Sequence, residues 1–374
     1  MRKIAVWGTG LRAAKFVYKN KIDAAFFIDN YVEDSVWKFM GKKVVKFCDI
    51  EVPGDYFILV VSGENAYMSI KAQLISAGER EFCDFCYYLH FRKKVAVLHG
   101  NCHMQIIKEY LLSSTDFCEK YALYPFIPIQ NLSGKIEEEV LCNCDLFIHQ
   151  DIQAANEFGY ELSDEYVLPK LKDSCFSITV PNLYNLGNGF FPGMSLAANP
   201  NNKAICAGKS AFGMFPYTDP VIDKAIREGK DEKTILEVCH GEVYTEKEIL
   251  DNFSQTFTKI EEREKNWDIP IYDFLMSYCK KELLFYDIGH PTNFVLRYIA
   301  TEVLKMLGCS SEEIECKWTL GEHQMPIYPI VSKVLELEYK QEYLRTESTG
   351  KKLLDDMDFD EYVKEYIYWN YKID

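Results

Sequence analysis

The chain has 374 residues, of which 48% are hydrophobic, 14% aromatic and 26% charged. This length is too great for one typical hydrophobic core and the apolar content is too high for a disordered chain, so we expect two folded domains. The formal net charge of -15 argues against nucleic acid or an anionic membrane surface as the main partner, because both are bound through extensive basic surfaces.

Cysteine usage and hydropathy predict a cytoplasmic protein. The 13 cysteines are odd in number and irregularly spaced, which is typical of reduced, mostly buried thiols rather than of a disulfide framework. No apolar stretch approaches the ~18 residues of a membrane span, and the first residues have the pattern of a strand rather than of a secretion signal. We therefore expect no membrane span. The oligomeric state, monomer or homo-oligomer, stays open.

Residues 1–92 are predicted to form a small Rossmann-like domain, a parallel sheet with helices on its faces. Short apolar runs that alternate with helical patterns are typical of this architecture. The expected strands span residues 3–7, 24–28, 56–61 and 82–88, and the expected helices end at residue 19 and span residues 66–77.

A glycine turn follows the first predicted strand and leads into the first helix. Gly8 and Gly10 would let backbone amides approach a phosphate at the helix N-terminus, and Asp29 lies about 20 residues further on, where an acid can bind a ribose hydroxyl. Ala13 replaces the third glycine of the usual motif, and such turns also serve strand–helix packing alone. Nucleotide binding and simple packing both remain open.

The second predicted domain spans residues 93–374 and begins with another α/β pattern. Its strands end in polar side chains before loops, and because ligands of open α/β sheets bind at the carboxyl ends of the strands, this pattern predicts one shared cleft. The expected strands span residues 95–98, 121–125, 145–148 and 177–180. One expected helix ends near residue 112, two span residues 245–267 and 271–281, and another follows residue 291. Further helices are expected in the amphipathic tail, residues 337–374.

Cys102 is the predicted nucleophile of this cleft. It stands in the turn Gly100, Asn101, Cys102, His103, between an apolar strand and a helical pattern. The unpaired amides and the positive dipole end of a helix N-terminus favour a thiolate there. We expect Gly100, Asn101 and His103 to contact the substrate, and the amides of Cys102 and His103 to stabilise an oxyanion.

His290 is the predicted general base, although it lies far along the chain from Cys102. Asp287, three residues earlier, has the position of an acid that orients the imidazole and stabilises its charged form. Gln150 and Asn182 each follow a predicted strand, so they are expected in the same cleft. Gln150 is a further candidate oxyanion donor, and Asn182 a candidate substrate contact.

Further substrate contacts are expected beside these residues. Tyr184 and Asn185 precede a glycine-rich loop, and aromatic and amide groups suit the surface of a sugar. A donor that carries phosphates would need local cations, because the overall charge is negative. The candidate cations are Arg263, Lys203 and Lys209.

Residues of metal-ligand type gather near the Cys102 turn, but their spacing does not predict a metal site. Cys142 and Cys144 are separated by one residue, which is shorter than the usual paired zinc motif. We therefore expect no bound metal.

Four motifs in this order resemble those of the WcbI family of polysaccharide-modifying proteins, within the broader SGNH hydrolase superfamily. The matching segments are Gly100-Asn101-Cys102, residues 144–150, residues 180–184 and His290-Pro291-Thr292. The resemblance implies an SGNH-like α/β fold, acetyl-CoA or another coenzyme A thioester as donor, and a sugar or nucleotide-sugar of a capsular or other surface polysaccharide as acceptor. Residues 26–30 and 41–44 resemble the small Rossmann-like domains that precede sugar O-acyltransferases, which implies nucleotide-sugar binding there.

The chain departs from the broader superfamily at the nucleophile, where Cys102 replaces the usual serine and Asn101 the preceding acid; His103 stands where the closer family commonly has glutamine. A cysteine remains compatible with acyl transfer, because thiol–thioester exchange is nearly isoenergetic. The leading hypothesis is a CoA-dependent O-acyltransferase, in which either Cys102 is acylated or His290 deprotonates the acceptor directly. An SGNH-type esterase or deacylase and a non-catalytic nucleotide-sugar-binding protein are the alternatives.

Overall fold

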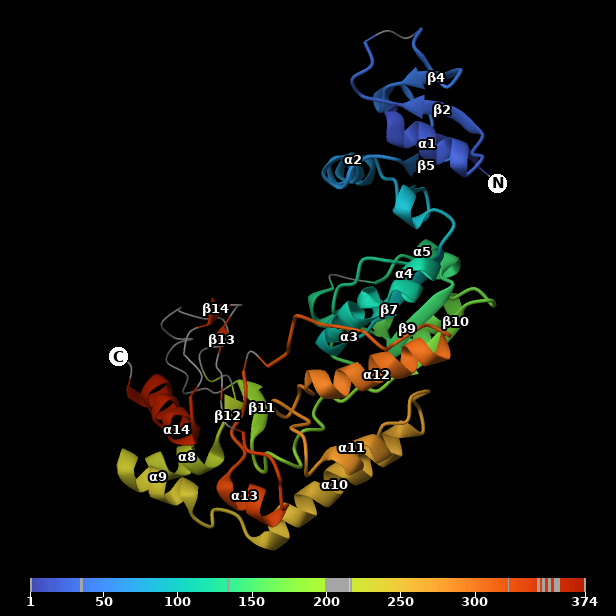
Figure 1. Ribbon diagram of the computed structural model, residues 1–374. Helices are drawn as coiled ribbons and strands as arrows, with labels where there is room; N and C mark the ends of the chain where they lie inside the picture. The colour runs from blue at the N-terminus through green and yellow to red at the C-terminus, as the bar shows by residue number, and fades with distance from the viewer. Residues whose placement is uncertain are drawn as a thin grey trace.

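The computed structural model holds two larger β-sheets that follow one another along the described part of the chain. The first has six strands and the second four. Figure 1 shows the first sheet at the top, the second below it, and a helical region furthest from the N-terminus. The structure describes residues 2–372, apart from 34–35, 133–134, 199–214, 216, 322, 342–343, 345–346, 349–350 and 353–356.

The first sheet has the strand order β3-β4-β2-β1-β5-β6, and its neighbours are parallel except for the antiparallel pair β3–β4. Ala5 and Trp7 of β1 belong to one buried cluster and Val6 to another, because successive side chains of a strand point to opposite faces. The elements are β1 (Lys3–Trp7), α1 (Leu11–Lys19), β2 (Ala24–Ile28), β3 (Lys38–Phe39), β4 (Lys42–Val45), β5 (Tyr56–Val60), α2 (Glu64–Ser76) and β6 (Phe85–Tyr87).

The second sheet has the order β10-β9-β7-β8 and is parallel throughout. The carboxyl ends of its strands therefore lie at one edge. The two sheets lie on either side of residue 92, where we propose the domain boundary. The strands are β7 (Lys94–His99), β8 (Tyr121–Leu123), β9 (Leu146–Gln150) and β10 (Phe176–Val180).

Two long helices lie beside the second sheet, as Figure 1 shows for α3 (Cys102–Ser113) and α12 (Asn293–Met306). Ile107 and Leu111 of α3 and Leu296 and Val303 of α12 are buried in the same core cluster. This contact joins segments almost 200 residues apart, and it explains the helical spacing of apolar residues in both. Shorter helices complete this part: α4 (Thr115–Lys120), α5 (Glu138–Asn143) and α6 (Asp164–Val167).

The region after residue 190 is mainly helical. Its longest helix, α10 (Glu246–Glu264), starts with a capping box between Thr245 and Glu248, which satisfies its first amides. The other elements are β11 (Ser195–Ala198), β12 (Tyr217–Thr218), α8 (Pro220–Arg227), α9 (Glu232–His240), α11 (Tyr272–Tyr278), α13 (Pro329–Val334), β13 (Glu347–Ser348), β14 (Lys351–Lys352), α14 (Phe359–Ile367) and a π-helical turn (Tyr368–Lys372). Short 3-10 turns lie at Phe47–Asp49, Pro53–Asp55, Tyr88–His90, Ile129–Asn131, Tyr160–Leu162 and Leu168–Lys170.

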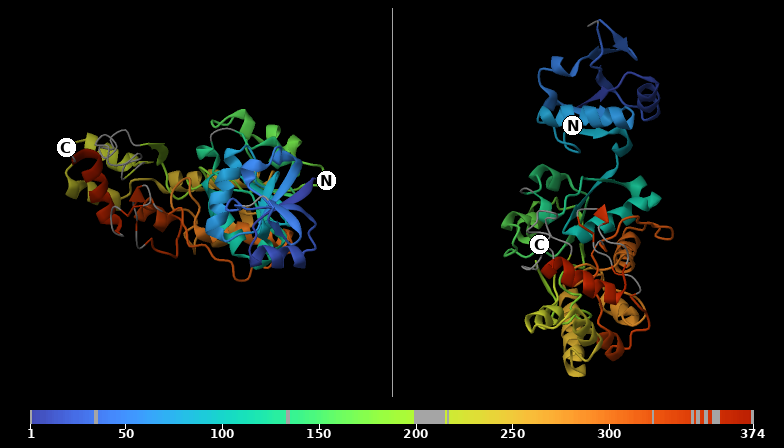
Figure 2. Two further views of the ribbon diagram at one scale, coloured as in Figure 1. Left: turned by 90° about the horizontal axis from the view of Figure 1, so that it is seen from above. Right: turned by 90° about the vertical axis from the view of Figure 1, so that its left-hand side faces the viewer.

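A buried acid cluster fastens the C-terminal tail to α8. Asp219 caps α8, and both of its carboxylate oxygens accept from the Tyr328 hydroxyl at 2.9 Å. The Tyr366 hydroxyl accepts the Asp219 amide at 2.9 Å and donates to Asp223 at 3.0 Å. Burial raises the pKa of Asp219 to about 6. The amphipathic tail thus covers its own chain, as Figure 2 also shows for α14.

The expected α/β architecture is confirmed, with local differences. The predicted strand over residues 82–88 is confined to Phe85–Tyr87, because Phe82 has a φ of 67° and the amide of Asp84 bonds back to Arg80. The β3–β4 hairpin lies outside the predicted strands. No helix among the described residues is long and apolar enough to cross a membrane.

Candidate active site

Cys102 is the first residue of α3, directly after β7. The N-cap residue Asn101 accepts the His103 amide on its side-chain oxygen at 2.9 Å. Gly100 has a φ of +156°, and a Cβ there would lie 2.5 Å from the Gln150 Oε1 and 2.6 Å from the Met104 Cγ. A glycine is therefore required for the chain to turn from strand to helix this close to β9.

The polar residues after the strands do converge beside Cys102. The Asn101 amide donates to the Gln150 Oε1 at 2.8 Å, and the Asn101 side chain donates to the Asn182 Oδ1 at 3.3 Å. Asn182 also accepts the Tyr184 amide at 3.2 Å. Gln150 is only 1% exposed, so its side chain holds the turn from the protein interior.

Asp287 and His290 form a tight unit on the loop before α12. The buried Asp287 carboxylate accepts the His290 Nδ1 at 2.8 Å, the His290 amide at 2.9 Å and the Gly289 amide at 2.7 Å. A Cβ on Gly187 would lie 2.4 Å from the Asp287 carbonyl oxygen, so the glycine-rich loop packs directly against this one. The orientation of the imidazole is therefore fixed by several bonds.

The His290 imidazole also interacts with Cys102. Burial opposes its charged form, but hydrogen bonds with Asp287 and Cys102 outweigh burial and raise the pKa of His290 from 6.5 to about 10. Because Asp287 occupies Nδ1, Nε2 is the atom left for the sulfur. The structure thus brings the predicted cysteine, histidine and aspartate together in the predicted order.

His103 lies beneath this group and is completely buried. Its Nε2 lies 2.9 Å from the Gly289 carbonyl oxygen, and its Nδ1 lies 3.4 Å from the Gln150 Nε2. Since a carbonyl only accepts, Nε2 carries the proton and Nδ1 accepts from Gln150. Burial and the nearby His290 lower the pKa of His103 to about 3, so it stays neutral and links α3 to the 287–290 loop.

The expected oxyanion donors are partly engaged elsewhere. The His103 amide is used by the Asn101 cap, and the Gln150 Nε2 contacts His103 and, at 3.4 Å, the Pro181 carbonyl oxygen. The Cys102 amide is in the first helical turn, where amides have no intrahelical acceptor.

The expected substrate contacts differ in exposure. His103 is completely buried and both of its ring nitrogens have protein partners, so it does not face the substrate as expected, whereas Tyr184 and Asn185 are exposed. Tyr184 is 46% exposed, and Asn185 has a φ of 61° in the left-handed turn that follows. Arg263 lies 3.7 Å from the Asp151 carboxylate, which follows β9, and its guanidinium stacks on Trp267 at 5.4 Å. Lys203 and Lys209 lie outside the described residues.

The candidate nucleotide turn belongs to the first sheet, away from Cys102. A Cβ on Gly8 would lie 2.4 Å from the Val61 carbonyl oxygen, so this glycine has a packing reason. Gly10 is the N-cap of α1 and makes no side-chain cap bond. Asp29 accepts from the Thr9 hydroxyl and, at 2.9 Å, from the Tyr31 amide.

Sequence reasoning missed two residues near this group, Tyr217 and His323. Burial, followed by the charges of Asp287, Tyr184 and Cys102, raises the pKa of Tyr217. Burial lowers the pKa of His323 to about 4, against the charge of Asp287. Neither residue lies in a recognisable motif, so only the tertiary structure reveals them.

The histidines of β7 and β9 have separate partners. His99 contacts the Leu162 carbonyl oxygen at 2.7 Å, and His149 contacts Asp164 and Thr179 at 3.2 Å each. Within the described ranges, no three His, Cys, Asp or Glu side chains are grouped to hold a metal ion.

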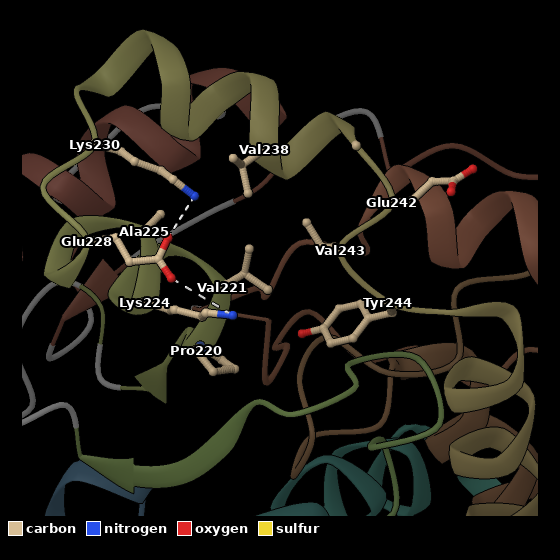
Figure 3. A pocket seen from close by; sticks show the side chains of 11 residues that line it. Pro220, Val221, Lys224, Ala225, Glu228, Lys230, Val238, Glu242, Val243 and Tyr244 are labelled. Atoms are coloured by element: carbon tan, nitrogen blue, oxygen red, sulfur yellow. Dashed lines mark ion pairs between the residues drawn. The ribbon is translucent and has the colours of Figure 1, made fainter.

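A cavity of about 550 Å³ lies between α8 and α9, but its lining includes none of the predicted catalytic residues. Figure 3 shows Lys224 and Lys230 on its wall, both paired with Glu228. The chemically competent groups lie instead around Cys102, beside His290 and Asp287.

Fold and site define an α/β protein with a cysteine, histidine and aspartate at the carboxyl edge of a parallel sheet. The family model described as "Polysaccharide biosynthesis enzyme WcbI" matches residues 95–312, so the chain belongs to the WcbI family of polysaccharide biosynthesis enzymes. No curated protein matches the chain.

One solved structure, of WcbI, has a TM-score of 0.59 at 19% identity, over 76% of this chain and 91% of that protein. It is described as a novel polysaccharide biosynthesis enzyme, in its native form without a disulfide bond between coenzyme A and one of its cysteines. At this identity the likeness concerns the fold.

Proposed function

We propose that the protein is a CoA-dependent O-acyltransferase, most simply an acetyltransferase, that modifies a sugar of a capsular or other surface polysaccharide or of its precursor. The observation that carries the proposal is the shared imidazole of His290, which interacts with both Asp287 and Cys102. A nucleophile, a proton carrier and an orienting acid in this order suit acyl transfer through a covalent intermediate.

The raised pKa of His290 favours acylation of Cys102 over direct transfer. In the proposed mechanism Cys102 attacks as a thiolate paired with the imidazolium of His290, which carries its proton at neutral pH. The sulfur attacks the thioester carbonyl, the carbon–sulfur bond to CoA breaks, and His290 gives its proton to the departing CoA sulfur. The neutral imidazole then takes the proton of the acceptor hydroxyl as its oxygen attacks the acyl group, which releases the Cys102 thiolate.

The oxyanion formed in each step needs donors about 3 Å away. We propose the Cys102 amide as the main donor, because Gln150 and the His103 amide have other partners. Gln150 then acts by fixing the Asn101 amide, which keeps the first turn of α3 in place.

Several features support a CoA donor and a sugar acceptor. The solved WcbI structure is described by reference to coenzyme A and a cysteine. Arg263 supplies a cation beside β9 for a phosphate, although Asp151 shares its charge. The exposed Tyr184 offers an aromatic face to a sugar. We propose nucleotide-sugar binding by Gly8, Gly10 and Asp29 only as a secondary role.

Mass spectrometry after incubation with acetyl-CoA tests the proposal. We expect an acetyl group on Cys102 at pH 7, its loss in Cys102→Ala, and its retention in the control Cys142→Ala, since Cys142 is exposed and outside the site. Absence of both adduct and CoA binding would refute the proposal. Release of acetate from a simple ester without transfer would instead favour the esterase hypothesis.

A further inference from the structure

His323 carries a buried imidazole whose hydrogen-bonding groups are not satisfied within the described part of the chain. It is 8% exposed, and neither Nδ1 nor Nε2 has a partner among the described residues. Leaving a buried polar group unpaired is costly. Such a group therefore calls for a ligand or another functional reason.

The segment that carries His323 is fixed to the catalytic loop on both sides. The Met325 amide donates to the Tyr286 carbonyl oxygen at 2.8 Å, and a Cβ on Gly321 would lie 2.9 Å from the Tyr286 ring. Tyr286 directly precedes Asp287, and its amide donates to the His290 carbonyl oxygen at 2.8 Å. His323 is thus held beside the catalytic loop by the backbone.

Two aromatic rings lie beside the imidazole, one from β12 and one from a residue two positions before it. The Tyr217 ring lies 5.2 Å from the His323 ring and the Phe215 ring lies 6.4 Å from it, both edge-on. The Tyr217 hydroxyl is also close enough to feel the charges of Cys102 and Asp287. The imidazole and the phenol therefore both lie within range of the charge of Asp287.

We propose that His323 and Tyr217 form the subsite that binds the sugar acceptor beside Cys102, an inference that rests on the proposed function. A neutral imidazole offers one donor and one acceptor and a phenol offers both, which matches adjacent hydroxyls of a sugar. The partly exposed Tyr217 ring supplies apolar surface for the carbon–hydrogen face of the sugar ring. The acceptor then supplies the partners that the imidazole lacks.

Saturation-transfer NMR with a mixture of glucose, galactose, mannose and N-acetylglucosamine tests this subsite on the full chain. We expect signals from at least one sugar in the wild type and in Cys102→Ala, a loss of at least tenfold in His323→Leu and Tyr217→Phe, and partial recovery in His323→Gln. His240→Leu is the matched control, because the exposed His240 is the last residue of α9 and pairs with Asp360.

Melting temperature separates a binding role from a structural one. Because the imidazole has no partner among the residues that the structure describes, we expect His323→Leu to melt at the same or a higher temperature than the wild type. If it melts lower, Tyr217→Phe decides: lost sugar signals at an unchanged melting temperature support the subsite, and retained signals overturn it. Absence of any sugar signal in the wild type also overturns it.

The outcome is independent of the acyl-transfer test. An acetyl adduct on Cys102 together with unchanged sugar signals in the His323 and Tyr217 variants would refute the subsite and leave the proposed function standing. Sugar binding that depends on both residues, without CoA binding, would refute the proposed function and keep the subsite.

Discussion

Replacing Asp287 by asparagine should separate the role of the carboxylate from its packing. The asparagine oxygen can still accept the Gly289 and His290 amides, which now bond one carboxylate oxygen at 2.7 and 2.9 Å. The side-chain nitrogen would face the His290 Nδ1, which now donates to the other oxygen at 2.8 Å. Because two donors cannot pair, the imidazole must turn or place its proton on Nε2.

The expected change in the pKa of His290 follows from the loss of the charge-assisted hydrogen bond to Asp287, which is worth about 1.5–3 kcal/mol. At about 1.4 kcal/mol per pKa unit, the pKa of His290 should fall by roughly one to two. Since the imidazolium then loses the carboxylate that orients it and stabilises its charge, acylation should slow by about 10²–10⁴-fold.

NMR titration of the His290 ring and quenched-flow acylation by acetyl-CoA measure both effects. The raised pKa means that protonated His290 stabilises the folded wild-type protein. This contribution is fully present at pH values below 6.5, the ordinary pKa of histidine, and is lost as the pH rises through about 10. In Asp287→Asn this loss should move to lower pH. An unchanged His290 titration, with acylation at the wild-type rate, would refute the reasoning.

Three further changes have defined outcomes. Gly100→Ala should destabilise the fold by ~2–4 kcal/mol in urea unfolding, because its Cβ would lie 2.5 Å from the Gln150 Oε1. Gly10→Ala has open space around its Cβ, so its free energy of unfolding should differ from that of the wild type by at most about 0.5 kcal/mol. Burial raises the pKa of Asp219 to about 6, so this acid should make the unfolding free energy fall as the pH rises from about 4 to about 6, and Asp219→Asn should flatten that profile. His103→Leu should slow acylation at least tenfold and cost ~1–3 kcal/mol, because Gly289 and Gln150 lose their partner.

Each of these has a result that would contradict it. Equal stability of the two glycine variants would remove the steric argument for Gly100. A stability profile that is the same in Asp219→Asn would mean that another acid controls that pH range. Full acylation in His103→Leu would show that the 287–290 loop is positioned without the buried imidazole.

The sequence by itself determined the order of the main elements and singled out the residues that we propose as reacting groups. Apolar runs marked the strands around Cys102, because a strand buried on both faces has few polar positions. The position of Cys102 after Gly100 followed from local geometry, and the spacing of Asp287 and His290 followed from the reach of one side chain. These features depend on residues close together in the chain, so the sequence alone predicts them.

Only the tertiary structure decided which residues that are far apart in the sequence lie close together. The contact of Cys102 with His290 depends on α12 packing against α3, and the neutral state of His103 depends on burial and on the Gly289 carbonyl oxygen. His323 carries no local signal, since its place beside the catalytic loop comes from the bond between Met325 and Tyr286. Burial and long-range hydrogen bonds are properties of the packed chain, so the sequence alone does not reveal them.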